Sequence, residues 1–239
     1  MKNYSILSCF LALSLSVFSA FAQLSVGVQG GYVKNYLNTS TGYLVSTQYA
    51  PATGFSIGIP IRYSVNKWLA FQVEPQLIQK NYRLNRTGSL DGLYQTTTNQ
   101  YLQLPIMGHF SFGGARLKGF MNLGGYAGYW ATSTNQGALF AFSPQLEDET
   151  DESDALPDYL LQKFNESYTF DGRKDRRLEI GLLAGTGIGY QAGRYNFFVE
   201  GRYYYALSDQ QKNYMINQIP RYNQTYALQV GCLYQLTLR

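Results

Sequence analysis

The sequence predicts an all-β fold: an eight-stranded, closed, antiparallel up-and-down transmembrane β-barrel, with short turns at its periplasmic end and long loops at its outer end. Three observations lead to this prediction. Apolar and polar side chains alternate with period two over long stretches, and short connections alternate with long ones along the chain. After residue 22, no segment has the roughly 18 consecutive apolar residues that a membrane-spanning helix requires.

An export signal is predicted at residues 1–22, and a single β-barrel domain at residues 23–239. Lys2 supplies a short positive start, and residues 6–18 are mostly apolar. Residues 20–22 (AFA) then have the small-x-small pattern that signal peptidase cleaves. The remainder of the chain is therefore expected outside the cytoplasm, after export by the Sec pathway.

Composition narrows the class of protein further. Most of the apolar run follows Cys9, so this cysteine does not mark a lipoprotein. Removal of the signal leaves Cys232 as the only cysteine, which excludes an internal disulfide. Tyrosine (22 residues) and glycine (24 residues) are frequent, which favours strands over helices. The net charge of +4 is too weak to predict a nucleic-acid partner.

Eight alternating stretches define the expected strands. In the second stretch, Ile57, Ile59 and Ile61 share one face, whereas Gly58 and Arg62 share the other. Two-residue and three-residue turns that contain Gly or Asn are hairpin signals, and an even strand count returns both ends to the periplasmic side. The expected strands are 24–32, 55–63, 69–80, 102–110, 117–129, 178–189, 196–205 and 228–238. The short turns are 65–67, 113–115 and 192–193, and the long loops are 35–52, 84–98, 134–174 and 209–221.

The apolar row of each strand is expected to face lipid. A soluble β-barrel, with the apolar row inside, is the alternative. The strands are longer than the five or six residues common in soluble proteins. The polar row is rich in glycine, which suits the narrow interior of an eight-stranded barrel. Aromatic residues crowd near the strand ends, as in the interfacial girdles of membrane barrels. These girdle candidates are Tyr63, Trp68, Tyr101, Tyr129, Trp130, Tyr190, Tyr195, Tyr203, Tyr204 and Tyr205.

Three prolines fall inside expected strands: Pro60, Pro75 and Pro105. Proline has no N–H to donate to the ladder, and a closed barrel has no edge strand to accommodate it. We therefore expect a bulge or a strand irregularity at each proline.

Six charged side chains fall on the polar rows and are expected in the lumen. An unpaired charge there is costly, so acids and bases should pair. A packed ion-pair plug is favoured, because an eight-stranded barrel has room only for side chains or one small ligand. A narrow ion path, or acid–base chemistry at the three carboxylates, are the alternatives. The six residues are Arg62, Glu74, Lys118, Glu179, Glu200 and Arg202.

No catalytic residue, cofactor or metal site is predicted. His109 is the only histidine, and Ser111 shares its face, but the sequence has no G-x-S-x-G elbow. One cysteine and one histidine do not make a Cys/His metal site. The glycines of 185–189 alternate within a strand and do not open a helix, so they relieve crowding in the barrel and do not bind a nucleotide.

The third long loop is the most unusual segment. An acidic run is followed by a short expected helix that starts near Pro157 and includes Leu161 and Phe164, and then by the basic residues of 173–177. The loop is either solvated, with its acidic and basic ends attracting one another, or a surface contact. Such a contact would involve a partner protein or divalent cations that bridge to lipopolysaccharide, although the ordered spacing of a calcium loop is missing. The acidic residues are Glu147, Asp148, Glu149, Asp151, Glu152 and Asp154.

Several segments together give a resemblance over nearly the whole mature chain. The chain resembles the PorT-like outer-membrane β-barrel family, and the Leu-Pro-Ile step at 104–106 is its most distinctive piece. The resemblance implies an eight-stranded barrel in the outer membrane and implies little about activity. The family is named after a member linked to a secretion machine, and no motif here carries that role. The segments are 25–32 (SVGVQGGY), 54–58 (GFSIG), 71–77 (FQVEPQL), 101–106 (YLQLPI), 124–126 (GGY), 185–189 (GTGIG) and 200–205 (EGRYYY).

The sequence therefore predicts a monomeric integral outer-membrane protein with a plugged polar lumen, not an enzyme. It would act as a structural or surface-interaction scaffold through its long outer loops. The expected partners are outer-membrane lipids and lipopolysaccharide, the barrel-assembly machinery and an unidentified envelope protein. A narrow channel or transport-related barrel is the alternative. A lipid-modifying enzyme or a secretion-system component comes third.

Overall fold

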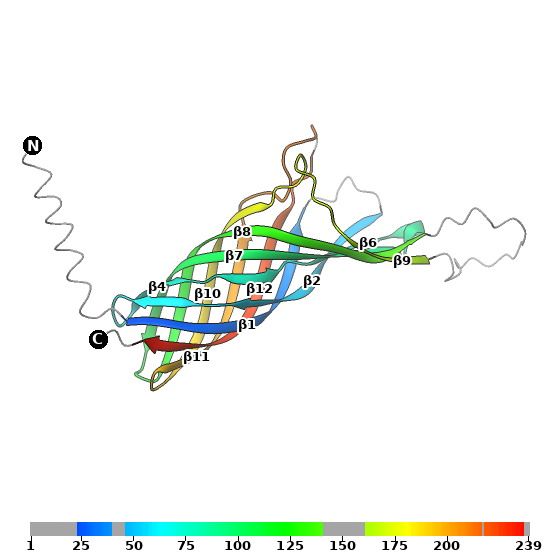
Figure 1. The fold of residues 1–239 in the computed structure, drawn as a ribbon. Helices are drawn as coiled ribbons and strands as arrows, with labels where there is room; N and C mark the ends of the chain where they lie inside the picture. The colour runs from blue at the N-terminus through cyan, green and yellow to red at the C-terminus, as the bar shows by residue number, and fades with distance from the viewer. Residues whose placement is uncertain (1–22, 40–45, 141–160, 217, 237–239) are drawn as a thin grey trace, which may run out of the picture.

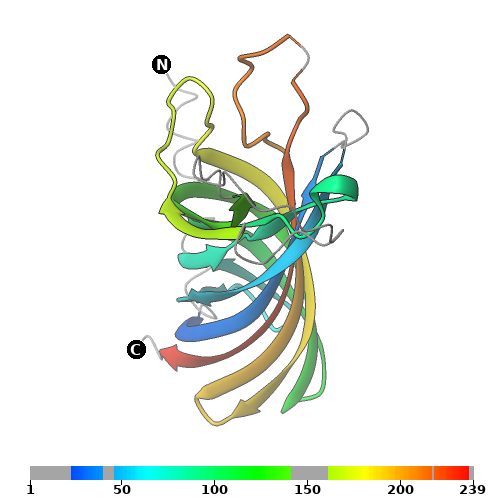
Figure 2. The same cartoon turned by 90° about the vertical axis from the view of Figure 1, so that its right-hand side faces the viewer.

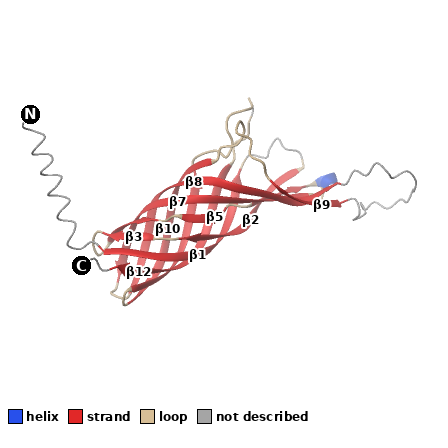
Figure 3. Ribbon diagram, viewed as in Figure 1, coloured by secondary structure: helices blue, strands red, loops and turns tan. Residues whose placement is uncertain are grey.

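The strands form one antiparallel sheet that closes into a tilted barrel (Figures 1 and 3). The computed structural model describes residues 23–39, 46–140, 161–216 and 218–236. The ring closes because β1 pairs with β12 on one side and with β2 and β3 on the other. Figure 2, turned by 90°, shows the strands running diagonally beside one another. The predicted signal peptide lies outside the described residues.

Twelve assigned strands make eight passes across the barrel wall, as the sequence predicts, and each pass is called a stave below. The second stave consists of β2 and β3, and the third of β4, β5 and β6, while β9 pairs only with the outer end of β8. The bounds are β1 Gln23–Asn38, β2 Thr47–Gly58, β3 Ile61–Ser64, β4 Leu69–Val73, β5 Gln76–Gln79, β6 Tyr82–Arg86, β7 Tyr94–Gly113, β8 Leu117–Phe140, β9 Leu161–Ser167, β10 Leu178–Ala192, β11 Tyr195–Ala206 and β12 Tyr222–Leu236.

The short turns occur where the sequence predicts them, whereas the first and second outer loops are shorter than expected. The strands continue into the expected loops, so that β8 alone has 24 residues and rises about 3.3 Å per residue. β7, β8 and β9 thereby extend beyond the ring (Figure 1). The expected short helix after Pro157 is wrong at Leu161 and Phe164, which belong to strand β9. The acidic run of 147–154 lies outside the described residues.

The prolines interrupt two staves without shifting their register. Pro60 separates β2 from β3, and Pro75 separates β4 from β5, yet the pairs Gln29↔Gly58 and Val26↔Ile61 lie in one continuous register. The expected irregularity at Pro105 is wrong, because Pro105 pairs with Tyr126 within unbroken β7. The register shift in β7 lies instead between Gln100 and Tyr101.

Each proline keeps its acceptor role. The carbonyls of Pro60, Pro75 and Pro105 accept the N–H groups of Gly27 (3.0 Å), Ile59 (3.0 Å) and Glu74 (3.1 Å), respectively. Only the return hydrogen bond of each pair is missing, since proline has no N–H. The three missing bonds fall at neighbouring positions on four successive staves and form a proline seam across the wall.

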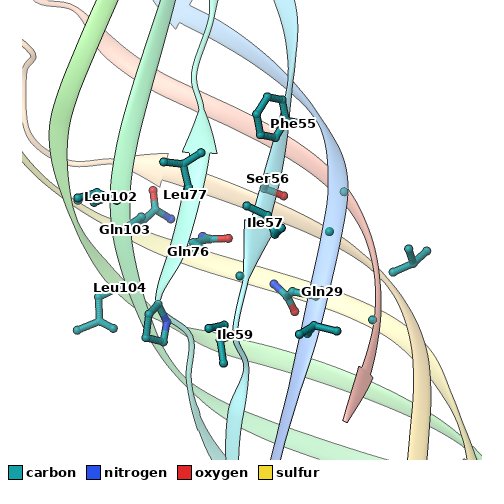
Figure 4. A pocket seen from close by; sticks show the side chains of 18 of the residues that line it. Gln29, Phe55, Ser56, Ile57, Ile59, Gln76, Leu77, Leu102, Gln103 and Leu104 are labelled. Carbon is teal, nitrogen blue, oxygen red and sulfur yellow. The ribbon is translucent and has the colours of Figure 1, made fainter.

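The apolar rows face outward, so the soluble alternative is wrong. Phe71, Ile106 and Val230 are 54–57% exposed, whereas Glu74 and Arg202 are almost fully buried. Figure 4 shows this alternation in the wall, where buried Gln29, Ser56, Gln76 and Gln103 interleave with apolar Phe55, Ile57, Leu77 and Leu102. A continuous apolar exterior around a polar interior is the arrangement of a membrane barrel.

The aromatic girdle is smaller than the sequence suggests. Tyr101, Trp130 and Tyr204 are buried in the lumen, and their assignment to the girdle is wrong. Each occupies an inward-facing position in the alternation of its strand. The exposed members are Tyr63, Trp68, Tyr129, Tyr190, Tyr195 and Tyr205.

Helix is almost absent from the described residues, where Gly88–Leu90 forms one 3-10 turn. None of the described helices has the length and apolar character needed to cross a membrane.

Chemical labelling tests the orientation. In a Cys232→Ser background, Arg173→Cys in an outer loop should react with a membrane-impermeant maleimide on intact cells. Asn66→Cys, in the turn between β3 and β4, should react only after the outer membrane is opened. Val199→Cys, which faces lipid, should stay unlabelled in both cases. Labelling of Asn66→Cys on intact cells would show that the orientation is reversed.

Candidate functional site

The lumen contains two layers of buried charge, and strand alternation positions every member. Glu74 and Lys80 come from the third stave, Glu179 from β10, and Glu200 and Arg202 from β11. Within a strand, residues two apart point the same way, so Glu200 and Arg202 enter the lumen together. β11 lies four staves from the third stave in an eight-stave ring, so these two elements face one another across the barrel.

The first layer is centred on Arg202. Its Nη1 and Nη2 donate to Glu74 Oε1 (2.8 Å) and Oε2 (3.1 Å), while its Nε and Nη2 donate to Glu200 Oε1 (2.8 Å) and Oε2 (2.7 Å). One guanidinium therefore binds two carboxylates in bidentate fashion, the geometry that arginine supports best. Gln29 and Gln72 also donate to Glu74, and Asn122 donates to Glu200. Arg202 thus joins opposite walls of the barrel.

The second layer is centred on an ion pair between Lys80 and Glu179. Glu179 also accepts hydrogen bonds from the Tyr126 hydroxyl (3.0 Å) and from Asn223 (2.6 Å). The Lys80 ammonium lies 4.5 Å from the ring centroid of Tyr126 and 5.1 Å from that of Tyr101. Aromatic faces stabilise a desolvated cation, so both the Glu179 carboxylate and the two tyrosine rings stabilise this ammonium.

Five of the six charges predicted in the lumen are buried there: Arg62, Glu74, Glu179, Glu200 and Arg202. Lys118 differs. It is half-buried at the periplasmic mouth and has no ion pair among the described residues.

The sixth buried charge is Lys80, which the sequence analysis left out of the lumen set. Its even-numbered position, shared with Gln72, Glu74 and Gln76, was the available signal. With Lys80 in place of Lys118, three bases balance three acids within the described lumen.

Buried amides line the lumen near the two layers. Gln76 pairs with Gln103 on β7 and with Gly58, which pairs with Gln29 on β1. Gln29, Gln76 and Gln229 each have an amide oxygen without a hydrogen-bond partner, and both amide atoms of Gln103 lack one. Unpartnered buried amides of this kind are sites where ordered water binds.

Gly185 makes room for the first layer. A Cβ at this position would lie 2.2 Å from Glu200 Oε1. Because Arg202 and Asn122 hold that carboxylate, it has little freedom to move away. Gly185 therefore leaves space for the Glu200 carboxylate, in agreement with the role in relieving crowding that the sequence suggests for 185–189.

Stacked rings cover the outer end of the lumen. Trp130 stacks on Tyr101 (6.0 Å between centroids, 7°) and on Tyr168 (6.1 Å, 9°). The Tyr168 hydroxyl donates to Asp175 at 3.1 Å, and burial together with the Asp175 charge raises the pKa of Tyr168 to about 12. The phenol therefore stays protonated and keeps this donation at physiological pH. Arg177 secures the ring stack by donating to the Trp130 carbonyl (3.0 Å).

His109 and Ser111 are not joined. His109 Nδ1 lies 2.7 Å from Asn122 Oδ1, and because Asn122 Nδ2 donates to Glu200, the Asn122 oxygen accepts a hydrogen bond from the Nδ1–H of His109. Ser111 Oγ donates to the Lys67 carbonyl (3.2 Å). His109 thus serves the ion-pair network through Asn122.

The ion pair of the second layer should show strong coupling. Lys80→Met or Glu179→Gln alone leaves a buried group without its partner, so each should lower the free energy of unfolding by about 3–5 kcal/mol. The double variant should lose much less than the sum. Urea unfolding in lipid vesicles, followed by circular dichroism, measures this cycle. Strictly additive losses would disprove the coupling, and Arg173→Gln, in an exposed pair, should leave stability unchanged.

Gly185→Ala should disturb the Arg202 layer. We expect a loss of about 1–3 kcal/mol, typical of overpacking in a filled interior. Gly201→Ala is the matched control, because a Cβ there would lie 4.0 Å from the Thr186 carbonyl oxygen. Equal unfolding midpoints for the two variants would contradict the role given to Gly185.

The chain is similar to several solved outer-membrane proteins at low sequence identity. No curated protein matches the chain significantly. Neisserial surface protein A is 14% identical, with a TM-score of 0.45, and the match covers 90% of this chain and 99% of that one. Ail of Yersinia pestis, solved with the heparin analogue sucrose octasulfate, is 13% identical, with a TM-score of 0.39 and the same coverage. The outer membrane protease OmpT from Escherichia coli is 10% identical, with a TM-score of 0.30, over 90% and 96% of the two chains. None of these likenesses identifies a ligand or an activity for this chain.

The family match is extensive. The model of the family described as "Outer membrane protein beta-barrel domain" matches residues 21–211, which is more than half of the chain. The chain therefore belongs to this family and is an outer-membrane β-barrel protein.

Proposed function

We propose that this protein is a closed, non-catalytic scaffold that anchors an interaction surface in the outer membrane. The observation that carries the proposal is the filled lumen. The Arg202 layer and the Lys80–Glu179 layer bring charges from several staves together across the interior. In a barrel of eight staves such side chains fill the cross-section, so no wide aqueous path remains.

The outer end supports a role at the cell surface. The stack of Tyr101, Trp130 and Tyr168 covers the lumen, and the strands beyond it continue away from the membrane. Exposed Arg173 and Lys174 lie on one outer loop, and Lys212 on the next donates its backbone N–H to the Lys174 carbonyl (2.7 Å). A cationic rim of this kind suits contact with the anionic groups of lipopolysaccharide or with an acidic partner protein.

A finer assignment within the family is also proposed. The ordered segments from 25–32 to 200–205 support a PorT-like affiliation, and two of them supply the centre of the lumen network. Glu74 belongs to 71–77 (FQVEPQL), and Glu200 and Arg202 belong to 200–205 (EGRYYY). Two of the segments that carry the resemblance thus supply side chains that fill the lumen.

Planar-bilayer recording separates the scaffold from the channel alternative. Pure protein should give no steady single-channel current at neutral pH, because the two ion-pair layers and the ring stack obstruct the lumen. The Glu74→Ala/Arg202→Ala variant, which removes the cross-lumen contact, is the comparison and should show increased leak. Discrete, reproducible currents from the unmodified protein would refute the closed scaffold and favour a narrow channel.

Photo-crosslinking identifies what the surface meets. A photoreactive amino acid at Arg173 should capture lipopolysaccharide or an envelope protein in intact cells, whereas the same group at Asn66 should not capture the same species. Identical adducts from both positions would count against a dedicated outer surface.

A further inference from the structure

The periplasmic mouth of the barrel contains a basic vestibule that the proposed function does not use. Its volume is about 610 Å³, and its lining includes Arg62, Lys67, His109, Lys118 and Arg194. None of the described residues that line it is acidic. Lys67 and Arg194 belong to the short turns at the rim, whereas Arg62, His109 and Lys118 lie on strands further in. The vestibule therefore differs from the two lumen layers, in which Arg202 and Lys80 are paired with Glu74, Glu200 and Glu179.

Arg62 gives the strongest indication that the vestibule binds an anion. Its side chain is 92% buried (8% exposed), and its Nε donates to Gln72 Oε1 at 2.8 Å. Within the described chain, its two terminal nitrogens have neither a hydrogen-bond acceptor nor a carboxylate within ion-pair distance. Arg202, one layer deeper, has every nitrogen bonded. Neither terminal nitrogen is fully enclosed, so both open onto the vestibule, where the oxygens of a ligand can reach them.

The other cations of the vestibule add to the same positive electrostatic potential. Lys118 is half-buried on β8 and has no ion pair or hydrogen bond among the described residues. Lys67 and Arg194 add two charges at the rim. A cleft lined by charge of one sign, with apolar walls such as Phe120 and Leu233, focuses its potential and concentrates counter-ions. The chemistry that fits is a multivalent oxyanion: the fork of Arg62 suits two oxygens at once, and Lys118 supplies a point charge.

We propose that this vestibule binds a phosphate-bearing molecule that enters from the periplasm, with Arg62 and Lys118 as its principal contacts. The groups line the inside of the barrel mouth, not its lipid-facing wall, and this placement favours a soluble phosphate compound over an inner-leaflet phospholipid headgroup. The site is independent of the outer surface and of the closed lumen, so either proposal can fail alone.

Calorimetric titration of the full mature barrel with inorganic pyrophosphate tests the site. In zwitterionic phosphatidylcholine nanodiscs, the unmodified protein should bind with one-to-one stoichiometry and with an affinity that falls as salt is raised. Arg62→Gln should weaken binding roughly tenfold or more, as expected for the loss of charge-assisted hydrogen bonds. Lys118→Gln, at a less buried position that is safer for folding, should weaken it severalfold. Arg116→Gln, at an exposed position in a periplasmic turn outside the vestibule lining, is the matched control and should bind as the unmodified protein does.

The outcomes are distinct. Absence of binding to the unmodified protein, or equal weakening by Arg116→Gln, overturns the proposal, the latter because it would indicate diffuse surface charge. Repeating the titration in phosphatidylglycerol nanodiscs separates the two sources of phosphate. Unchanged affinity supports a soluble ligand. A loss of affinity that disappears in Arg62→Gln would show that a lipid headgroup occupies the site and would overturn the soluble assignment.

Discussion

The constraint on which the structure depends is that charge placed inside a narrow apolar cylinder has to be paired there. Arg202 meets this constraint by binding Glu74 and Glu200 at once. Removing ions from water costs several kcal/mol each, and attraction offsets that cost only when hydrogen bonds satisfy the remaining lone pairs. Gln29, Gln72 and Asn122 supply those bonds. The apolar exterior, the glycines that admit bulky neighbours and the closed lumen all follow from locating this network at the axis.

The sequence predicts which face of the barrel wall each side chain points to, because side chains alternate between the two faces along a strand. Alternation alone placed Glu74, Glu179, Glu200 and Arg202 inside and Phe71, Ile106 and Val230 outside, because a one-residue slip would move every side chain to the wrong face. The three wrong girdle assignments come from ignoring this alternation. Tyr101, Trp130 and Tyr204 were assigned to the girdle for their position near strand ends, although their numbers share the inward parity of Gln103, Asn122 and Arg202.

Other features had no local signal. Glu179 lies 99 residues from Lys80 and Glu74 lies 128 residues from Arg202 in the chain, and only the closed ring brings these partners together. The outer ends of the strands resembled loops because they are polar on both faces, as strands beyond the hydrocarbon are free to be. The vestibule was not predicted for a related reason. Its cations come from two turns and two strands, and no short motif connects them.

The proline seam has a mechanical consequence. Gly27, Ile59 and Glu74 belong to neighbouring staves whose ladders each lack one hydrogen bond at this level, which lowers the local resistance of the wall to separation. Glu74 is also the residue that Arg202 holds from the far side of the barrel. The Glu74 carboxylate thus lies at the level of the missing hydrogen bonds, and its ion pair with Arg202 ties this part of the wall to the opposite side of the barrel. A fluctuation that parts these staves has to stretch a bidentate contact across the lumen before water can enter the wall.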